Sequence, residues 1–213
     1  MENKYLNWLN YFSLKKILII SIVIHLILEY LLPSFYGDQF LQVESFYNFI
    51  EGHGLSLSYA HIENLSEVYY EKLNLWPFGF VYLNYPWWLL TKNIFYSVLI
   101  NNTFAIIIFF CSIYKILVFL DATINDRYKK IVLLFLAIQI MPSRYMGATD
   151  LWCLACLTWA TYLTIKIIND QTQPTFKNHL CKLILIAVLV SLTISLRFTY
   201  WVFIIAIPFI FLV

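Results

Sequence analysis

The sequence is dominated by apolar runs that approach the length needed to cross a lipid bilayer. A spanning helix needs about 20 mostly apolar residues, and candidate runs occupy residues 17–32, 94–120, 131–142, 151–168, 183–196 and 198–213. The run at 131–142 is short, and it extends back through Tyr128 if it spans. Charged residues make up only 12% of the chain, about half the usual fraction for soluble domains. These features predict an all-α, polytopic transmembrane bundle of about six spans.

One further apolar segment, WPFGFVYLNYPWWLL at 76–90, either crosses the membrane or lies flat on its surface. If it lies flat, ten Lys and Arg side chains fall on the side of the N-terminus and four fall opposite. If it spans, the split becomes six against eight. Basic residues stay on the cytoplasmic side, so the flat interpretation is favoured. It places the N-terminus in the cytoplasm and makes residues 33–93 a large outer loop.

The outer loop is predicted to contain two interfacial amphipathic helices, one at 76–90 and one at 38–51. In the second, Phe40, Val43, Tyr47 and Ile50 form an apolar stripe at helical spacing. Gly52 and Gly54 supply a helix stop. Asp38 stands at the helix start, where a carboxylate is favoured by the helix dipole, so the local pattern alone favours a capping role.

The cysteine spacing gives no redox or metal site. Cys153 and Cys156 form a CxxC pair, but they lie inside an apolar run that has no further Cys or His beside them. We expect buried structural thiols there and no disulfide framework.

The ends of the chain also give expectations. The first apolar run is followed by no small-residue cleavage site, which predicts a retained anchor. The chain is still apolar at Val213, which predicts a single transmembrane module, residues 1–213, from the N-terminal part of something longer.

The order of several motifs resembles the glycosyltransferase C superfamily, the polyprenyl-phosphate-sugar-dependent enzymes related to protein O-mannosyltransferases and lipid A aminoarabinose transferases. An apolar span, an Asp a few residues later and then FIEGHGLS resemble the first loop of that family. WPFGFVYLNYPWWLL is similar to its proline-led interfacial helix. The stretches NIFYSVLINNTFAIIIFFCSIYKIL, AIQIMPSRYMGATDLWCLACLTWATYL and SLTISLRFTYWVF are similar to its later spans and corners. The likeness covers essentially the whole chain, and it departs from the family pattern at Gln39, where a second acid is common, and at Pro77, which stands alone.

The resemblance implies a membrane glycosyltransferase that moves a hexose or pentose from a polyprenyl-phosphate donor to a lipid, glycan or protein acceptor. Transfer would take place on the non-cytoplasmic face with inversion, and a bacterial inner membrane is the expected location. Asp38 would be the general base, and the donor phosphate would be bound by Arg197, Arg144 or Lys92. Glu44, His53 and Asp150 would contact the acceptor or support the site. No metal ligand is assigned, although the family pattern leaves room for a divalent cation, and no nucleic-acid partner is expected.

Other interpretations of the same residues stay open. Arg197 could instead reach lipid head groups, and Asp150 could cap a helix or pair with Arg144. His53 could be a surface histidine without a role, and His25 and Glu29 could be structural groups of the first span. The chain as a whole could be a non-catalytic membrane subunit or fragment, or a component of a transporter or polymerase of lipid-linked oligosaccharides.

Overall fold

The structure is a computed structural model, and it describes residues 11–31, 38–61, 63–64, 66–72, 79–120, 125–139, 148–169 and 176–196. Of these residues, 82% are helical. The helices are α1 (Leu14–Leu31), α2 (Asp38–Ile50), α3 (Gly79–Thr91), α4 (Ile94–Phe119), α5 (Asp126–Gln139), α6 (Ala148–Ile168) and α7 (Phe176–Leu196). Two short strands, β1 (Ser56–Ala60) and β2 (Val68–Lys72), lie between α2 and α3.

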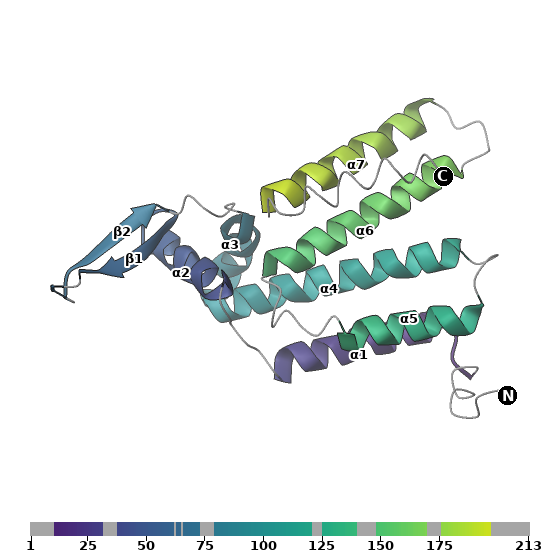
Figure 1. Ribbon diagram of the computed structural model, residues 1–213, viewed down its shortest axis with the longest axis horizontal. Coiled ribbons are helices and arrows are strands. Elements are labelled where there is room, and N and C mark those ends of the chain that lie inside the picture. Colours follow the sequence, from purple (N-terminus) through teal and green to yellow (C-terminus); the bar gives the residue numbers. More distant parts are fainter. Residues whose placement is uncertain are drawn as a thin grey trace.

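The long helices run side by side, and the short elements gather at one end of them (Figure 1). We call the end that carries α2, the strands and α3 the hairpin end, and the other the opposite end. Helices α4 and α6 both start at the hairpin end, whereas α1, α5 and α7 run toward it (Figure 1). Helix α4 packs against α6, α3 and α1, while α7 packs on α6 and α5 on α1. The bundle is therefore built around α4.

The contact between α4 and α6 is fixed by two tryptophans one heptad apart. The indole Nε1 of Trp152 donates to Asn101 Oδ1 at 3.0 Å, and that of Trp159 donates to the Ile108 carbonyl at 3.1 Å. Both pairs are separated by 51 residues, which is the constant offset of two parallel helices in register. An indole N–H normally finds a partner when buried, so these bonds define the relative height of the two helices.

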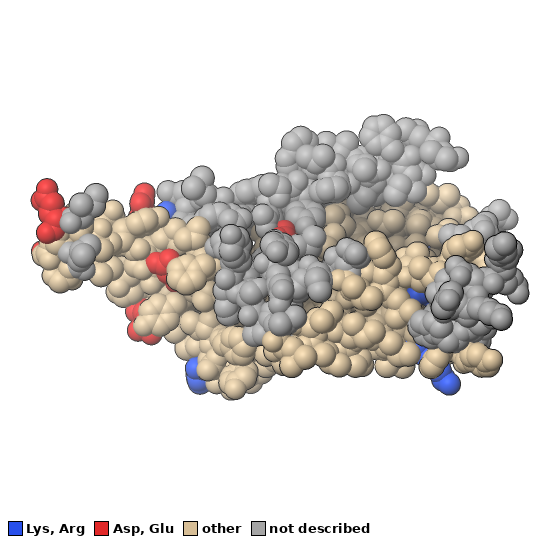
Figure 2. Space-filling model, turned by 60° about the horizontal axis from the view of Figure 1, so that its bottom comes forward, with Lys and Arg blue, Asp and Glu red and all other residues tan. Residues whose placement is uncertain are grey.

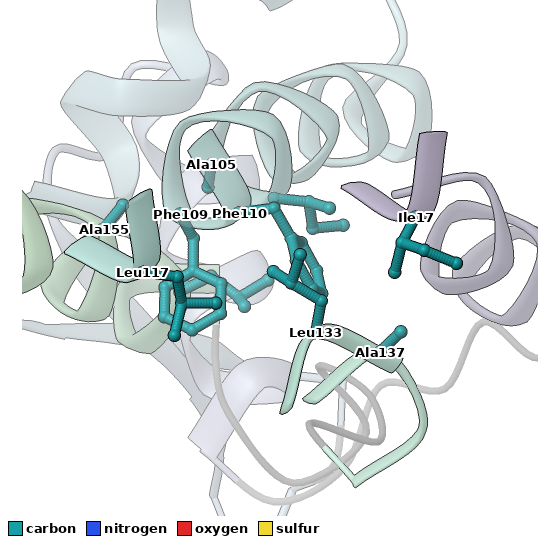
Figure 3. Packing of buried hydrophobic residues seen from close by; sticks show 10 residues of the cluster. Ile17, Ala105, Phe109, Phe110, Leu117, Leu133, Ala137 and Ala155 are labelled. Carbon is teal, nitrogen blue, oxygen red and sulfur yellow. The ribbon is translucent and has the colours of Figure 1, made fainter. Parts of the chain in front are cut away.

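The main core lies where α1, α4 and α5 meet, with one face of α6 (Figure 3). Ile17 of α1, Phe109 and Phe110 of α4 and Leu133 of α5 are buried there. The rings of Phe109 and Phe110 meet edge to face with centroids 5.4 Å apart. Small residues at the contact, Ala105, Ala137 and Ala155, allow the helices to approach closely.

A second apolar cluster attaches the short helices to the bundle. Phe46 of α2 and Phe80 of α3 meet edge to face with ring centroids 6.3 Å apart, and they pack with Val81 and Val98. This cluster positions α2 and α3 across the start of α4.

The bounds of α2 agree with the sequence prediction, and its end has a clear cause. Gly52 has φ +88°, a conformation that glycine adopts without strain. The amide of His53 donates to the Asn48 carbonyl at 2.9 Å and the amide of Gly52 to the Phe49 carbonyl at 3.3 Å, which is the Schellman pattern of a helix end.

The prediction of an all-α chain is wrong in the first loop. Strands β1 and β2 pair antiparallel, with Tyr59 opposite Tyr69 and Ser56 opposite Lys72. The tyrosines and the valine of these strands suit an extended backbone better than a helix. Outside this hairpin, the described elements are helices, as predicted.

Three helices are long and apolar enough to cross a membrane, and their qualifying parts are Ile94–Phe119, Thr149–Ile168 and His179–Leu196. In their described parts, the runs at 17–32 and 131–142 also form helices, α1 and α5, and the 14 described residues of α5 extend over about 21 Å. The run at 198–213 lies outside the described residues. A count of about six spans therefore stays a prediction.

The four cysteines are free thiols. Cys153 and Cys156 are buried in α6, and the Sγ of Cys153 donates to the Thr193 carbonyl of α7 at 3.6 Å. The predicted burial of both thiols is confirmed.

The approach of α3 to α7 gives a test of the packing. A Cβ at Gly79 would overlap Cδ2 of Leu196 and lie 3.1 Å from its Cα, so Gly79→Ala must push the two helices apart. We expect a loss of about 1–3 kcal/mol in the free energy of unfolding, the usual cost of overpacking. Thermal melting in detergent measures it.

The matched control is the same substitution in a Leu196→Ala background, where the clashing methyl group is gone. The penalty for Gly79→Ala should then shrink, a coupling that a double-mutant cycle reports directly. If the Gly79→Ala variant were as stable as the wild type, α3 and α7 would not approach each other as described.

Candidate functional site

Charge divides the molecule by its two ends. Among the described residues, the hairpin end carries the acidic side chains Glu44, Glu51, Glu63, Glu67, Glu71 and Asp150. Figure 2 shows acidic atoms gathered there. The described basic side chains on the opposite end are Lys15, Lys16, Lys115, Arg127, Lys129, Lys130, Lys166 and Lys182, while only Lys72 and Lys92 lie at the hairpin end. Asp126 is the one described acid of the opposite end, where its carboxylate pairs with Lys130 Nζ at 2.5 Å.

An apolar hollow, which we call the aromatic groove, runs between α2 and the start of α4. Its volume is about 400 Å³, and its lining residues are Phe40, Val43, Glu44, Tyr47, Ile94 and Phe95. Phe40 is 63% exposed and Tyr47 53% exposed, so large apolar faces are open to a ligand or to lipid. The groove begins at the first turn of α2, the helix that starts at Asp38.

The aromatic groove adjoins a more polar hollow, which we call the Lys92 pocket. It has a volume of about 370 Å³ and shares Tyr47, Ile94 and Phe95 with the groove. Its further lining residues are Ile50, Glu51, Trp88, Lys92 and Asn93. Together the two hollows offer an apolar path that ends beside one cation, Lys92, and one carboxylate, Glu51.

The backbone holds Lys92 firmly. Its φ is +51°, which is uncommon for a residue with a Cβ. The Lys92 amide donates to the Trp88 carbonyl at 2.8 Å, and the Lys92 ammonium lies 4.5 Å from the centre of the Trp88 ring, a cation–π contact. Asn93, the next residue, caps α4 by accepting from the Tyr96 amide at 3.1 Å.

Glu44 has a structural contact that the sequence did not reveal. Its Oε1 accepts from the Ser58 amide at 2.9 Å and also from the Ser58 hydroxyl. One helical turn later, the Asn48 amide group donates to the Ser56 carbonyl at 2.9 Å. The polar face of α2 therefore clamps β1, and Glu44 does so from the edge of the aromatic groove.

The other predicted site residues are dispersed. His53 is exposed and stacks on Tyr70, with ring centroids 3.8 Å apart and planes 9° apart. Asp150 is buried in the first turn of α6, where the helix dipole favours a carboxylate. Arg144 and Arg197 lie outside the described residues, as does the side chain of Asp38. The structure thus brings Glu44 and Lys92 to adjoining hollows and places His53 on the hairpin instead.

Buried neutral polar groups near the hairpin end escaped sequence analysis. Asn84 of α3, Asn101 of α4 and Thr149 of α6 are at most 1% exposed. Asn101 accepts from Trp152, and the Asn84 amide group donates to the Phe80 carbonyl at 2.8 Å. The signal that could have found them is the Asn101–Asn102 pair inside an apolar helix, since polar groups in such helices usually face protein rather than lipid.

His25 lies in the core rather than at the site. It is 1% exposed, and its ring meets Phe110 edge to face at 5.7 Å. The His25 Nδ1 lies 3.3 Å from the Ala137 carbonyl, so this nitrogen carries the proton of that hydrogen bond. Ala137 is in the last described turn of α5, so this contact joins the side chain of His25 in α1 to the backbone of α5. The side chain of Glu29 lies outside the described residues.

Comparison of the chain with protein-family models, curated proteins and solved structures finds no match. Within the described part of the chain, His, Cys, Asp and Glu form no group of three that could hold a metal ion.

The clamp between α2 and β1 can be tested by removing Glu44. Glu44→Ala leaves the Ser58 amide and hydroxyl without this acceptor. A hydrogen bond to a charged group contributes at most about 1.5–3 kcal/mol to stability. We expect the hairpin to open more often, with faster hydrogen exchange of the β1 and β2 amides and unchanged exchange in α4.

Glu51→Ala is the matched control, because Glu51 is an exposed acid just beyond the end of the same helix. It should leave the hairpin protected. Equal protection of the hairpin amides in Glu44→Ala and the wild type would rule out the clamp.

Proposed function

We propose that the protein is a membrane glycosyltransferase that moves a sugar from a polyprenyl-phosphate donor to an acceptor at the hairpin end. The observation that carries the proposal is the continuity of the aromatic groove with the Lys92 pocket, beside the helix that begins at Asp38. An isoprenoid chain needs an apolar path, and its phosphate needs a cation at the end of that path. The motif order that resembles the glycosyltransferase C superfamily supports the same function.

The reaction assigns separate tasks to the two ends of this region. The Asp38 carboxylate takes the proton of the acceptor hydroxyl, and the acceptor oxygen bonds to C1 of the sugar as the bond from C1 to the phosphate oxygen breaks. The electron pair leaves with the phosphate, so polyprenyl phosphate is released and the configuration at C1 is inverted. An aspartate has a reference pKa of about 3.9 and is ionised at neutral pH. Lys92, with Arg144 and Arg197 as further candidates, stabilises the leaving phosphate.

The orientation proposed for the chain follows from its charges. Basic residues are retained on the cytoplasmic side, and the opposite end carries most of the described ones. The chain then crosses the membrane several times with a cytoplasmic N-terminus, α2 and α3 lie at the outer interface, and a bacterial inner membrane is the proposed location. The exposed apolar side chains of α7, such as Leu183, Ile184 and Val188, suit contact with lipid.

Transfer of labelled sugar by the full-length protein, using polyprenyl-phosphate sugars as donors, tests the activity. Asp38→Asn should lower kcat about 10²–10⁴-fold, the usual worth of general-base help. Glu63→Gln, an exposed acid of the hairpin, is the control and should retain full activity. If Asp38→Asn and the wild type transfer equally, Asp38 has no part in the mechanism, and absence of transfer from every donor favours a non-catalytic subunit.

The donor contact is tested separately with Lys92→Met, which keeps the length of the side chain and removes its charge. We expect the KM for the donor to rise about 10-fold or more, the effect of losing one charge-assisted hydrogen bond. Lys72→Met at the end of β2 is the matched control and should leave the KM unchanged. An unchanged KM for Lys92→Met would remove the Lys92 pocket from donor binding.

Orientation is tested by thiol labelling in intact cells. Glu63→Cys introduces a thiol at the exposed hairpin, whereas the native Cys181 is exposed near the start of α7 at the opposite end. A membrane-impermeant maleimide should label position 63 in intact cells and Cys181 only after permeabilisation. The reverse pattern would place the hairpin end in the cytoplasm and would contradict the proposed site of transfer.

A further inference from the structure

Strand β2 forms an open edge of the hairpin that projects from the bundle (Figure 1). The sheet has two strands, and β2 is hydrogen-bonded to β1 alone among the described residues. All five residues of β2 are exposed, whereas Ser56 and Leu57 of β1 are buried. The outer edge of β2 therefore presents backbone groups that an extended chain can reach.

The two strands are not supported equally. Glu44 and Asn48 of α2 bond to β1, and α2 contacts β1 directly. Strand β2 pairs with β1, and two of its tyrosines contact histidines of the neighbouring loops, Tyr70 with His53 and Tyr69 with His61. A two-stranded hairpin is marginally stable in water, and a third strand raises its stability. This favours an extended segment as the occupant of the β2 edge.

One face of the hairpin combines aromatic rings with carboxylates. Tyr59 and Tyr69 are opposite each other in the register, so their rings lie on the same face, stacked at 5.7 Å. His61 is two residues from Tyr59 and contacts Tyr69, with ring centroids 4.9 Å apart. Glu67 and Glu71 are each two residues from Tyr69, so they flank its ring on that face. Lys72, the only basic residue of the hairpin strands, lies on the other face.

The charge of this face selects the chemistry of the occupant. Exposed carboxylates beside aromatic ring faces attract ammonium and guanidinium groups, through ion pairs and through cation–π contacts. The same carboxylates repel an anionic lipid surface. A strand added beside β2 places alternate side chains on the face of Glu67, Tyr69 and Glu71.

We propose that β2 receives an extended, lysine- or arginine-containing segment of a partner protein as a third strand. Main-chain hydrogen bonds along the β2 edge supply affinity, and the glutamates and tyrosines read basic residues at alternate positions of the segment. The proposal does not depend on the transfer reaction, because none of these residues lines the aromatic groove or the Lys92 pocket.

Binding of synthetic octapeptides to the full-length protein in uncharged detergent tests the proposal. The probe has lysine at alternate positions separated by threonine and valine. Two matched peptides replace lysine by glutamate, or carry N-methyl groups on alternate amides so that they cannot pair with a strand. We expect the lysine peptide to bind at least about 5-fold tighter than either, a ratio reachable with two or three exposed ion pairs.

Variants of the protein distinguish a specific effect of Glu67 and Glu71 from a general effect of net charge. Glu67→Gln with Glu71→Gln should weaken binding of the lysine peptide about 5-fold, and Tyr69→Ala should weaken it further. The control variant, Glu51→Gln with Glu63→Gln, removes two negative charges outside strand β2 and should change peptide binding less than 2-fold. Melting temperatures within a degree of the wild type confirm that the glutamine variants are folded.

Three results would overturn the proposal. Equal binding of the N-methylated peptide would mean that charge alone acts and no strand is added. Equal binding of the glutamate peptide would mean that the face does not read charge. Competition by a neutral oligosaccharide that is lost in Tyr69→Ala would make the aromatic face a sugar site instead.

Discussion

The parallel contact between α4 and α6 sets the frame on which the other elements depend. Trp152 and Trp159 each bond an α4 group 51 residues earlier in the chain, so the two helices have a fixed height and rotation. Helix α4 packs against α6 in this way, and it also contacts the α1–α5 pair and α3. In the most apolar part of α4, 50% is buried inside the protein, whereas the corresponding value for α7 is 11%. The centre of the bundle is thus filled by protein, while α7 presents an apolar surface to its surroundings.

The same helix places the candidate site. Val98 of α4 belongs to the cluster that seats Phe46 and Phe80, and Ile94 and Phe95 line both hollows. The aromatic groove and the Lys92 pocket therefore exist because two short helices are held across the start of a long one. The hairpin is joined to the bundle indirectly, through the hydrogen bonds between α2 and β1. Among the described residues, acidic side chains accumulate in these attached elements and basic ones at the far end of the bundle, so the charges are separated along its length.

Sequence patterns predicted what local physics decides. Apolar runs located the long helices, and the glycines after Ile50 located the end of α2, since Gly52 takes the positive φ that a Schellman end requires. The hairpin was missed because its tyrosines suit an interfacial belt as well as a strand, and because β1 is held by side chains 8 and 14 residues upstream. The resemblance to the glycosyltransferase C superfamily predicted Glu44 to be a site residue, and its observed bonds join it to Ser58. Lys92 could be placed in the loop but not beside Trp88, because its position depends on how α3 ends.

The left-handed backbone of Lys92 has a consequence for how this region can be altered. A residue with a Cβ pays about 1–2 kcal/mol in that conformation, and glycine does not. Replacement by glycine would therefore relax the joint between α3 and α4 while taking away the ammonium group over Trp88. At position 92 the backbone conformation and the positive charge depend on different atoms. Selection for thermal stability alone would therefore favour glycine, which keeps the turn between α3 and α4 and removes the ammonium group.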